Sequence, residues 1–87
     1  MKKIDLVLRD YVVKLPFDNL KYLAERFAER MGPDLSEAIE MCAKHPDIDR
    51  FFASASNYQE FWNAMDTVST AIEKEYARRM PELVSNG

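Results

Sequence analysis

Apolar residues recur every three or four positions along most of this 87-residue chain, which is the spacing of one face of an α-helix. Prolines at positions 16, 33, 46 and 81 interrupt the pattern, and a proline inside a helix removes one backbone hydrogen bond. With only 2 glycines, the chain has few of the turn residues that many short strands require. We therefore expect an all-α fold, a compact bundle of four to five helices with a long C-terminal helix.

The first two helices are expected over residues 3–15 and about 18–31. A strand is the alternative for residues 3–15, because valine and isoleucine are frequent there. Asp18 is a suitable N-cap for the second helix, and Gly32 followed by Pro33 predicts its end. The predicted buried face of the second helix consists of Leu20, Leu23, Ala24, Phe27, Ala28 and Met31.

The third helix is expected to start at Asp34, which has capping-box spacing to Glu37, and to carry His45 in its last turn. A short helical segment follows, with Ile48, Phe51, Phe52 and Ala55 in register. The last helix is expected from about Tyr58 to Arg79. Its start is predicted by a capping pair, either Ser56 with Gln59 or Asn57 with Glu60. Pro81 should end or kink it, and residues 84–87 should fray.

The charge of the chain argues against a nucleic-acid or membrane-surface protein. Residues 1–87 are too few for two cores, so they form a single helical domain. The net charge is −3 and the isoelectric point is about 5.1. Residues 27–41 have small and apolar residues at the positions that a helix-turn-helix motif requires, which leaves a DNA-binding regulator as the alternative function. The would-be recognition helix carries Asp34, Glu37 and Glu40, and these carboxylates would repel phosphates.

The single cysteine and the hydropathy pattern predict a cytoplasmic protein. Cys42 is the only cysteine, so the chain cannot form an intramolecular disulfide, which suits a reducing compartment. Asp5, Arg9 and Asp10 interrupt what could otherwise be the start of a signal peptide. No segment approaches the roughly 18 apolar residues of a membrane span. We expect no membrane association.

The sequence predicts no enzyme, no metal site and no cofactor. Cys42 and His45 have the spacing of half a metal site, but the chain has no second cysteine or histidine to complete it. The glutamates of the third helix lack a histidine at the spacing that di-metal carboxylate proteins use. An enzyme is the third hypothesis, and it would need a site assembled across helices.

Five aromatic residues within twelve positions point to a protein-interaction module, which could be a small regulator, adaptor or inhibitor. They are Phe51, Phe52, Tyr58, Phe61 and Trp62, more large rings than a core of this size readily covers. Because tryptophan, tyrosine and arginine dominate interface hot spots, we predict that Arg50, Tyr58 and Trp62 contact a protein partner, whose identity the sequence does not reveal.

The length of the last helix predicts a homodimer. At 1.5 Å per residue it would extend beyond the shorter helices and leave Ile72, Tyr76 and Met80 uncovered. These three residues are the predicted self-association surface, although Ser69 and Glu75 interrupt the apolar stripe. In the alternative, the N-terminal helix covers this end within a monomer.

Overall fold

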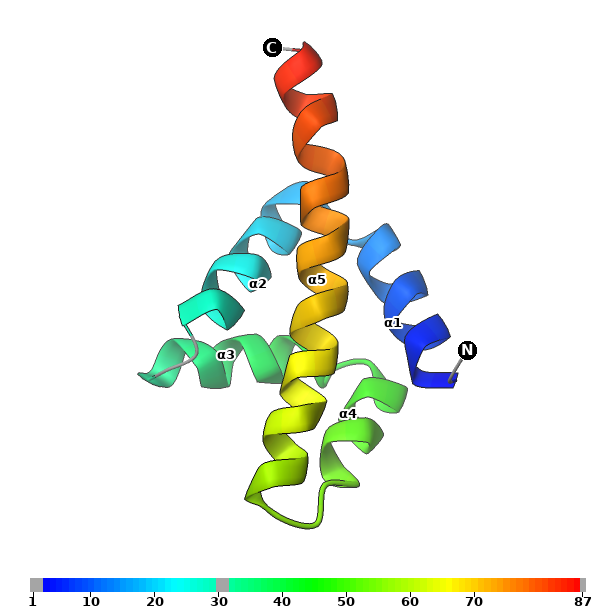
Figure 1. Ribbon diagram of the computed structural model, residues 1–87, viewed down its shortest axis with the longest axis vertical. Helices are drawn as coiled ribbons and strands as arrows, with labels where there is room; N and C mark the ends of the chain where they lie inside the picture. Colours follow the sequence, from blue (N-terminus) through cyan, green and yellow to red (C-terminus); the bar gives the residue numbers. More distant parts are fainter. Residues whose placement is uncertain (1–2, 30–31, 87) are drawn as a thin grey trace.

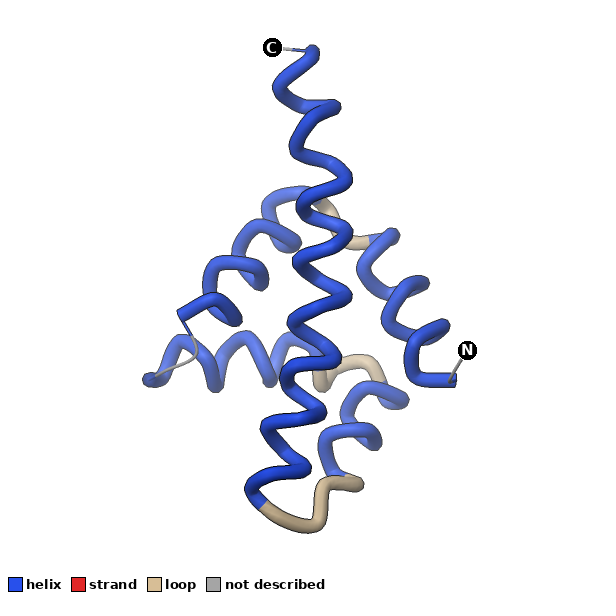
Figure 2. The backbone as a smooth tube through the Cα atoms, in the orientation of Figure 1, coloured by secondary structure: helices blue, strands red, loops and turns tan. Residues whose placement is uncertain are grey.

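The computed structural model describes residues 3–29 and 32–86, and it gives side-chain surroundings for 3–29 and 35–80. Its five helices are α1 (Lys3–Lys14), α2 (Phe17–Glu29), α3 (Gly32–Cys42), α4 (Pro46–Ala53) and α5 (Tyr58–Asn86), and the described ranges contain no strand (Figure 2). The predicted all-α bundle with a long C-terminal helix is confirmed, and residues 3–14 are helix rather than strand.

Helix α5 is the axis of the molecule (Figure 1). Its 29 residues span about 43 Å, close to the 45 Å long dimension of the chain. Helices α1, α2 and α4 pack directly against α5, while α3 packs against α2. The turn between α4 and α5 lies at the end of the molecule opposite the C-terminus (Figure 1). No described helix is long and apolar enough to cross a membrane.

One contiguous core contains most of the apolar residues that the periodicity placed on inner faces. Its fully buried members include Leu8, Leu20, Leu23, Phe27, Ala38, Cys42, Ile48, Met65, Val68 and Ile72. The prediction for α2 is wrong at Ala28, which is exposed, and Met31 lies outside the described residues. Ser69 and Glu75 were expected to interrupt the stripe of α5, yet both are buried.

Several predicted helix ends differ from the structure. Gly32 is the first residue of α3, and Asp18 is the second residue of α2 rather than its N-cap. The predicted cap at Asp34 depends on a side chain outside those described. Pro81 does not end α5, because the helix continues to Asn86, past the predicted fraying point. A proline removes only one hydrogen bond from its helix, so the surrounding residues can continue it.

His45 does not lie in the last turn of α3, which ends at Cys42. It is the N-cap of α4, where its Nδ1 accepts a hydrogen bond from the backbone N–H of Asp47 at 3.2 Å. Pro46 then occupies the first helical position, where its missing N–H has no intrahelical partner to lose. The ring of His45 meets the ring of Tyr11 edge-on, with 5.9 Å between the centroids.

A half-buried arginine, Arg79, joins α5 to the C-terminal end of α1. The Arg79 guanidinium donates hydrogen bonds to the carbonyls of Leu15 at 2.7 Å, Val12 at 2.8 Å and Val13 at 2.9 Å. The last carbonyls of a helix have no partner within the helix, so this contact caps α1 from a residue more than 60 positions away. Its remaining contact is with Glu75, whose Oε2 accepts from Nε at 2.7 Å.

The substitution Arg79→Ala should lower the free energy of unfolding by about 3 kcal/mol, because it leaves three helix-end carbonyls and a buried carboxylate with fewer donors. The neighbouring substitution Arg78→Ala is the matched control. Arg78 also binds Glu75, but its side chain is 57% exposed against 15% for Arg79. We expect the control to cost less than about 1 kcal/mol in urea unfolding. Equal costs for the two variants would contradict the capping role of Arg79.

The pH dependence of stability should report on Glu75. Hydrogen bonds from Arg78, and then from Arg79, lower the pKa of this carboxyl from its ordinary 4.5 to about 2. A lowered pKa in the folded state stabilises the fold above pH 4.5, and the contribution is lost as the pH falls toward 2. We therefore expect the difference in unfolding free energy between the wild type and Glu75→Gln to be constant above pH 4.5 and to shrink below it. A difference that persists unchanged at pH 2 would contradict this assignment.

Candidate protein-binding surface

The aromatic residues of α4 and α5 form a continuous chain of ring contacts. Ring centroids lie 6.2 Å apart for Phe51 and Phe52, 6.0 Å for Phe52 and Phe61, 6.5 Å for Phe61 and Trp62, and 5.7 Å for Trp62 and Tyr58. Phe52 is buried, Phe51, Phe61 and Trp62 are half-buried, and Tyr58 is 75% exposed. The chain of rings thus runs from the core to the surface, so the core holds the outer rings in fixed positions.

The turn that carries these rings is fixed by side-chain caps. Asn57 is the capping residue of α5, since its Oδ1 accepts the N–H of Glu60 at 2.9 Å, as one of the two predicted capping pairs requires. The Glu60 carboxylate folds back onto Ser56 and accepts from its N–H at 2.9 Å and its hydroxyl at 2.7 Å. These hydrogen bonds from Ser56 lower the pKa of Glu60. The rings of Tyr58 and Trp62 therefore stand on a well-anchored first turn.

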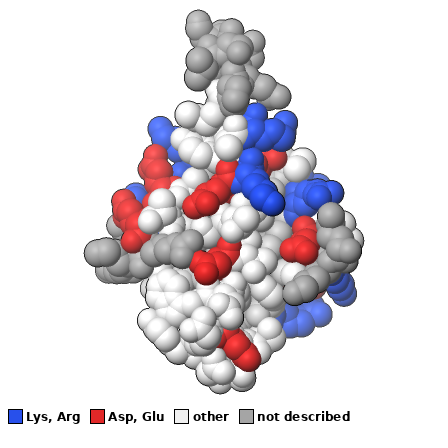
Figure 3. Space-filling model, in the orientation of Figure 1, with Lys and Arg blue, Asp and Glu red and all other residues white. Residues whose placement is uncertain are grey.

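The same end of the molecule is depleted in charge. Glu60 is the only charged residue between positions 51 and 65, in a chain that is 31% charged. Figure 3 shows the consequence: charged side chains gather over the upper part of this face, and its lower end is almost entirely uncharged. We call residues 51–63 the aromatic tip. Depletion of charge together with exposed aromatic rings is typical of the centre of a protein interface.

The structure brings two of the three predicted partner-binding residues together. Tyr58 and Trp62 meet edge-on in the aromatic tip. Arg50 is exposed, pairs with Asp47 at 3.3 Å, and belongs to a groove of about 300 Å³ between α1 and α4. Phe51 forms part of the wall of this groove and is the point where the groove meets the chain of rings.

The predicted self-association surface is largely covered within the chain. Ile72 is completely buried, so the expectation that it is uncovered is wrong. Tyr76 is half-buried and stacks on Phe17 with 5.8 Å between ring centroids. Only Met80, at 39% exposed, remains accessible among the three. Helices α1 and α2 both pack on α5, so the covering helices include α2 as well as the N-terminal helix that the monomer alternative named.

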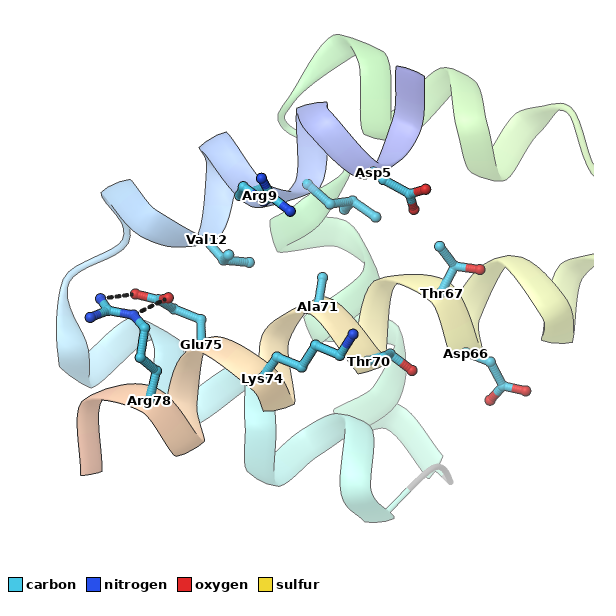
Figure 4. A pocket seen from close by; sticks show the side chains of 11 residues that line it. Asp5, Arg9, Val12, Asp66, Thr67, Thr70, Ala71, Lys74, Glu75 and Arg78 are labelled. Carbon is cyan, nitrogen blue, oxygen red and sulfur yellow. Dashed lines mark hydrogen bonds and ion pairs between the residues drawn. The ribbon is translucent and has the colours of Figure 1, made fainter. Parts of the chain in front are cut away.

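A second groove, of about 620 Å³, runs between α1 and α5. Figure 4 shows Asp5, Asp66 and Thr67 toward one end, and Glu75 bound to Arg78 at the other. The Thr67 hydroxyl donates to the backbone carbonyl of Asn63 at 3.1 Å, so it is not paired with a base. The groove lining contains neither histidine nor cysteine, and its charges of both signs alternate.

Among the described residues, Cys42 and His45 do not belong to a cluster of possible metal ligands. The part of the chain that the structure describes contains no group of three or more His, Cys, Asp or Glu side chains that could hold an ion. Cys42 is completely buried in the core, where burial raises the pKa of its thiol to about 11 despite a hydrogen bond with Tyr11. The pKa of Tyr11 is raised by its own burial and then by the neighbouring Cys42.

Comparisons of the chain with protein-family models, with curated proteins and with solved structures find no match. The proposed function therefore rests on the surface of this chain. Of its features, sequence reasoning identified the aromatic cluster but missed the depletion of charge, although the signal was present as a single Glu60 in the fifteen residues from 51 to 65.

The reactivity of Cys42 tests its placement in the core. A buried thiol with a raised pKa reacts slowly, because the thiolate is the nucleophile. We expect almost no reaction with a disulfide reagent such as dithionitrobenzoate at about pH 8 in the folded protein, and one equivalent after unfolding in urea. Native-state reaction at the rate of a small-molecule thiol would show that Cys42 is accessible and would contradict the core assignment.

Proposed function

We propose that this chain is a non-enzymatic protein-interaction module, a small regulator, adaptor or inhibitor that binds a protein through its aromatic tip. The observation that carries the proposal is Tyr58, which is 75% exposed and lies against Trp62 in a surface with a single charge. Large rings left in water in this way mark an interaction site.

The fixed geometry of the rings supports the same function. Trp62 is held between Tyr58 and Phe61, and the latter packs against the buried Phe52. Side chains that are already ordered lose little conformational entropy when a partner covers them, so more of the burial energy contributes to affinity. Arg50, on the groove between α1 and α4, is a second point of contact in this proposal, adjacent to the tip through Phe51.

The charge of α3 disfavours the DNA-binding alternative. Helices α2 and α3 do pack together, as the two helices of a helix-turn-helix motif would. However, Glu37 and Glu40 are exposed on α3, and Glu37 accepts a hydrogen bond from the Tyr22 hydroxyl at 2.7 Å. A recognition helix that presents carboxylates would repel phosphates. A cytoplasmic location remains part of the proposal, and a single buried thiol suits a reducing compartment.

A pull-down from native lysate of the source organism, with mass spectrometry, tests the function. The bait proteins are the wild type, Tyr58→Ala, and Leu6→Ala as the control. Leu6 is 53% exposed on α1, so the control removes a large exposed apolar side chain away from the tip. We expect one or more proteins to be retained by the wild type and the control and reduced at least about tenfold with Tyr58→Ala. Identical retention by all three baits would contradict binding through the tip.

A further inference from the structure

We infer that the partner of the aromatic tip is a second copy of this chain, packed tip to tip about a two-fold axis. The inference rests on the proposed function, because it names the partner of the same surface. It retains the homodimer that the sequence predicts and moves its interface from Ile72, Tyr76 and Met80 to residues 51–63.

The low charge of the tip allows it to pack against a second copy of itself. A two-fold axis places a surface against itself, so a patch of one charge faces the same charge, and like-charge pairs in an interface cost several kcal/mol. The chain carries a net charge of −3, yet its tip has one charged residue. Even that carboxylate, of Glu60, is turned back and hydrogen-bonded to Ser56. Two tips can therefore meet with little repulsion between like charges.

The polar groups of the tip can hydrogen-bond to their own kind. Asn57, Gln59 and Asn63 are exposed there, and each amide carries both donors and an acceptor. Carboxylates and ammonium groups cannot hydrogen-bond to their own kind when ionised, whereas amides and hydroxyls can. Gln59 already donates to Asn63 at 3.1 Å within one chain, which shows that these side chains are near enough to act together. A surface of amides, hydroxyls and rings is complementary to itself.

The position and size of the tip suit a small two-fold interface. The tip lies at the end of the molecule opposite the C-terminus, so tip-to-tip packing keeps the rest of each chain away from the other (Figure 1). Of residues 51–63 only Phe52 is buried, so at most twelve residues can contact the second copy. A standard interface uses roughly 20–30 residues a side, so this dimer is at the small end and exchanges readily with monomer.

Sedimentation equilibrium combined with fluorescence tests the inference, since Trp62 is the only tryptophan in the chain. The mass of the wild type should rise from 10.1 kDa toward twice that value between about 10 and 500 μM, the range for a small interface. Over the same range, the emission of Trp62 should shift to the blue as the second copy covers it.

The variants are Tyr58→Asp and, as a control, Leu6→Asp. Each puts a carboxylate in place of an exposed apolar side chain near the N-terminus of its helix, where the helix dipole favours an anion. Neither change should unfold the monomer, and far-UV circular dichroism checks this. Tyr58→Asp should weaken the dimer at least tenfold and abolish the blue shift, while Leu6→Asp should retain both.

A wild type that stays at 10.1 kDa throughout would overturn the inference, and so would a dimer that survives Tyr58→Asp or forms without the shift in Trp62 emission. These failures are separable from failure of the proposed function. If the chain stays monomeric and the tip still retains a different protein from lysate, the interaction module stands and only the second copy is excluded. If neither the second copy nor a lysate protein depends on Tyr58, both proposals fail.

Discussion

The ion pair between Glu75 and Arg79 is the interaction on which the arrangement of the other helices depends. An arginine guanidinium has five N–H donors, and four of them are used here, one on the carboxylate and three on carbonyls in the last turn of α1 and at Leu15 just after it. Both side chains are largely withdrawn from water, so each stabilises the charge of the other, and Arg78 pairs with Glu75 as well. The contact joins the end of α1 to α5 beside the turn into α2, where Phe17 stacks on Tyr76.

This contact also explains the asymmetry of the molecule. Helices α1 and α2 both pack along α5, and the groove between α1 and α5 extends as far as Asp66 and Thr67, while the short α4 packs on α5 as well. Eight residues of α4 bury Ile48 and Phe52 but leave the outer rings of Tyr58 and Trp62 partly in water. The aromatic tip, residues 51–63, is thus the region where the short α4 leaves rings of α5 uncovered.

The periodic pattern predicted most of the core because helical spacing alone places residues such as Leu20, Leu23 and Phe27 on one face. The pattern was wrong where contacts with residues distant in the sequence determine burial. Glu75 interrupts the apolar stripe in sequence yet is buried, because Arg78 and Arg79 donate hydrogen bonds to it, and local spacing does not reveal that Arg79 also reaches the carbonyls at the end of α1. Helix ends were predicted less well, since α3 begins at Gly32 and α5 continues past Pro81. Exposure of Tyr58 depended on the length of α4 and could not be predicted from composition.

The two ends of α5 belong to one helix but carry different groups of side chains. Tyr58 and Arg79 are 21 positions apart, about 32 Å along the axis, and substitutions that far apart have additive effects. Residues of the tip can therefore change without cost to the contact that holds α1. Over evolutionary time such a chain could exchange one binding specificity for another through a few substitutions at residues 51–63. The separation of its fold-determining contact from its exposed rings makes this small bundle a scaffold on which recognition can diversify.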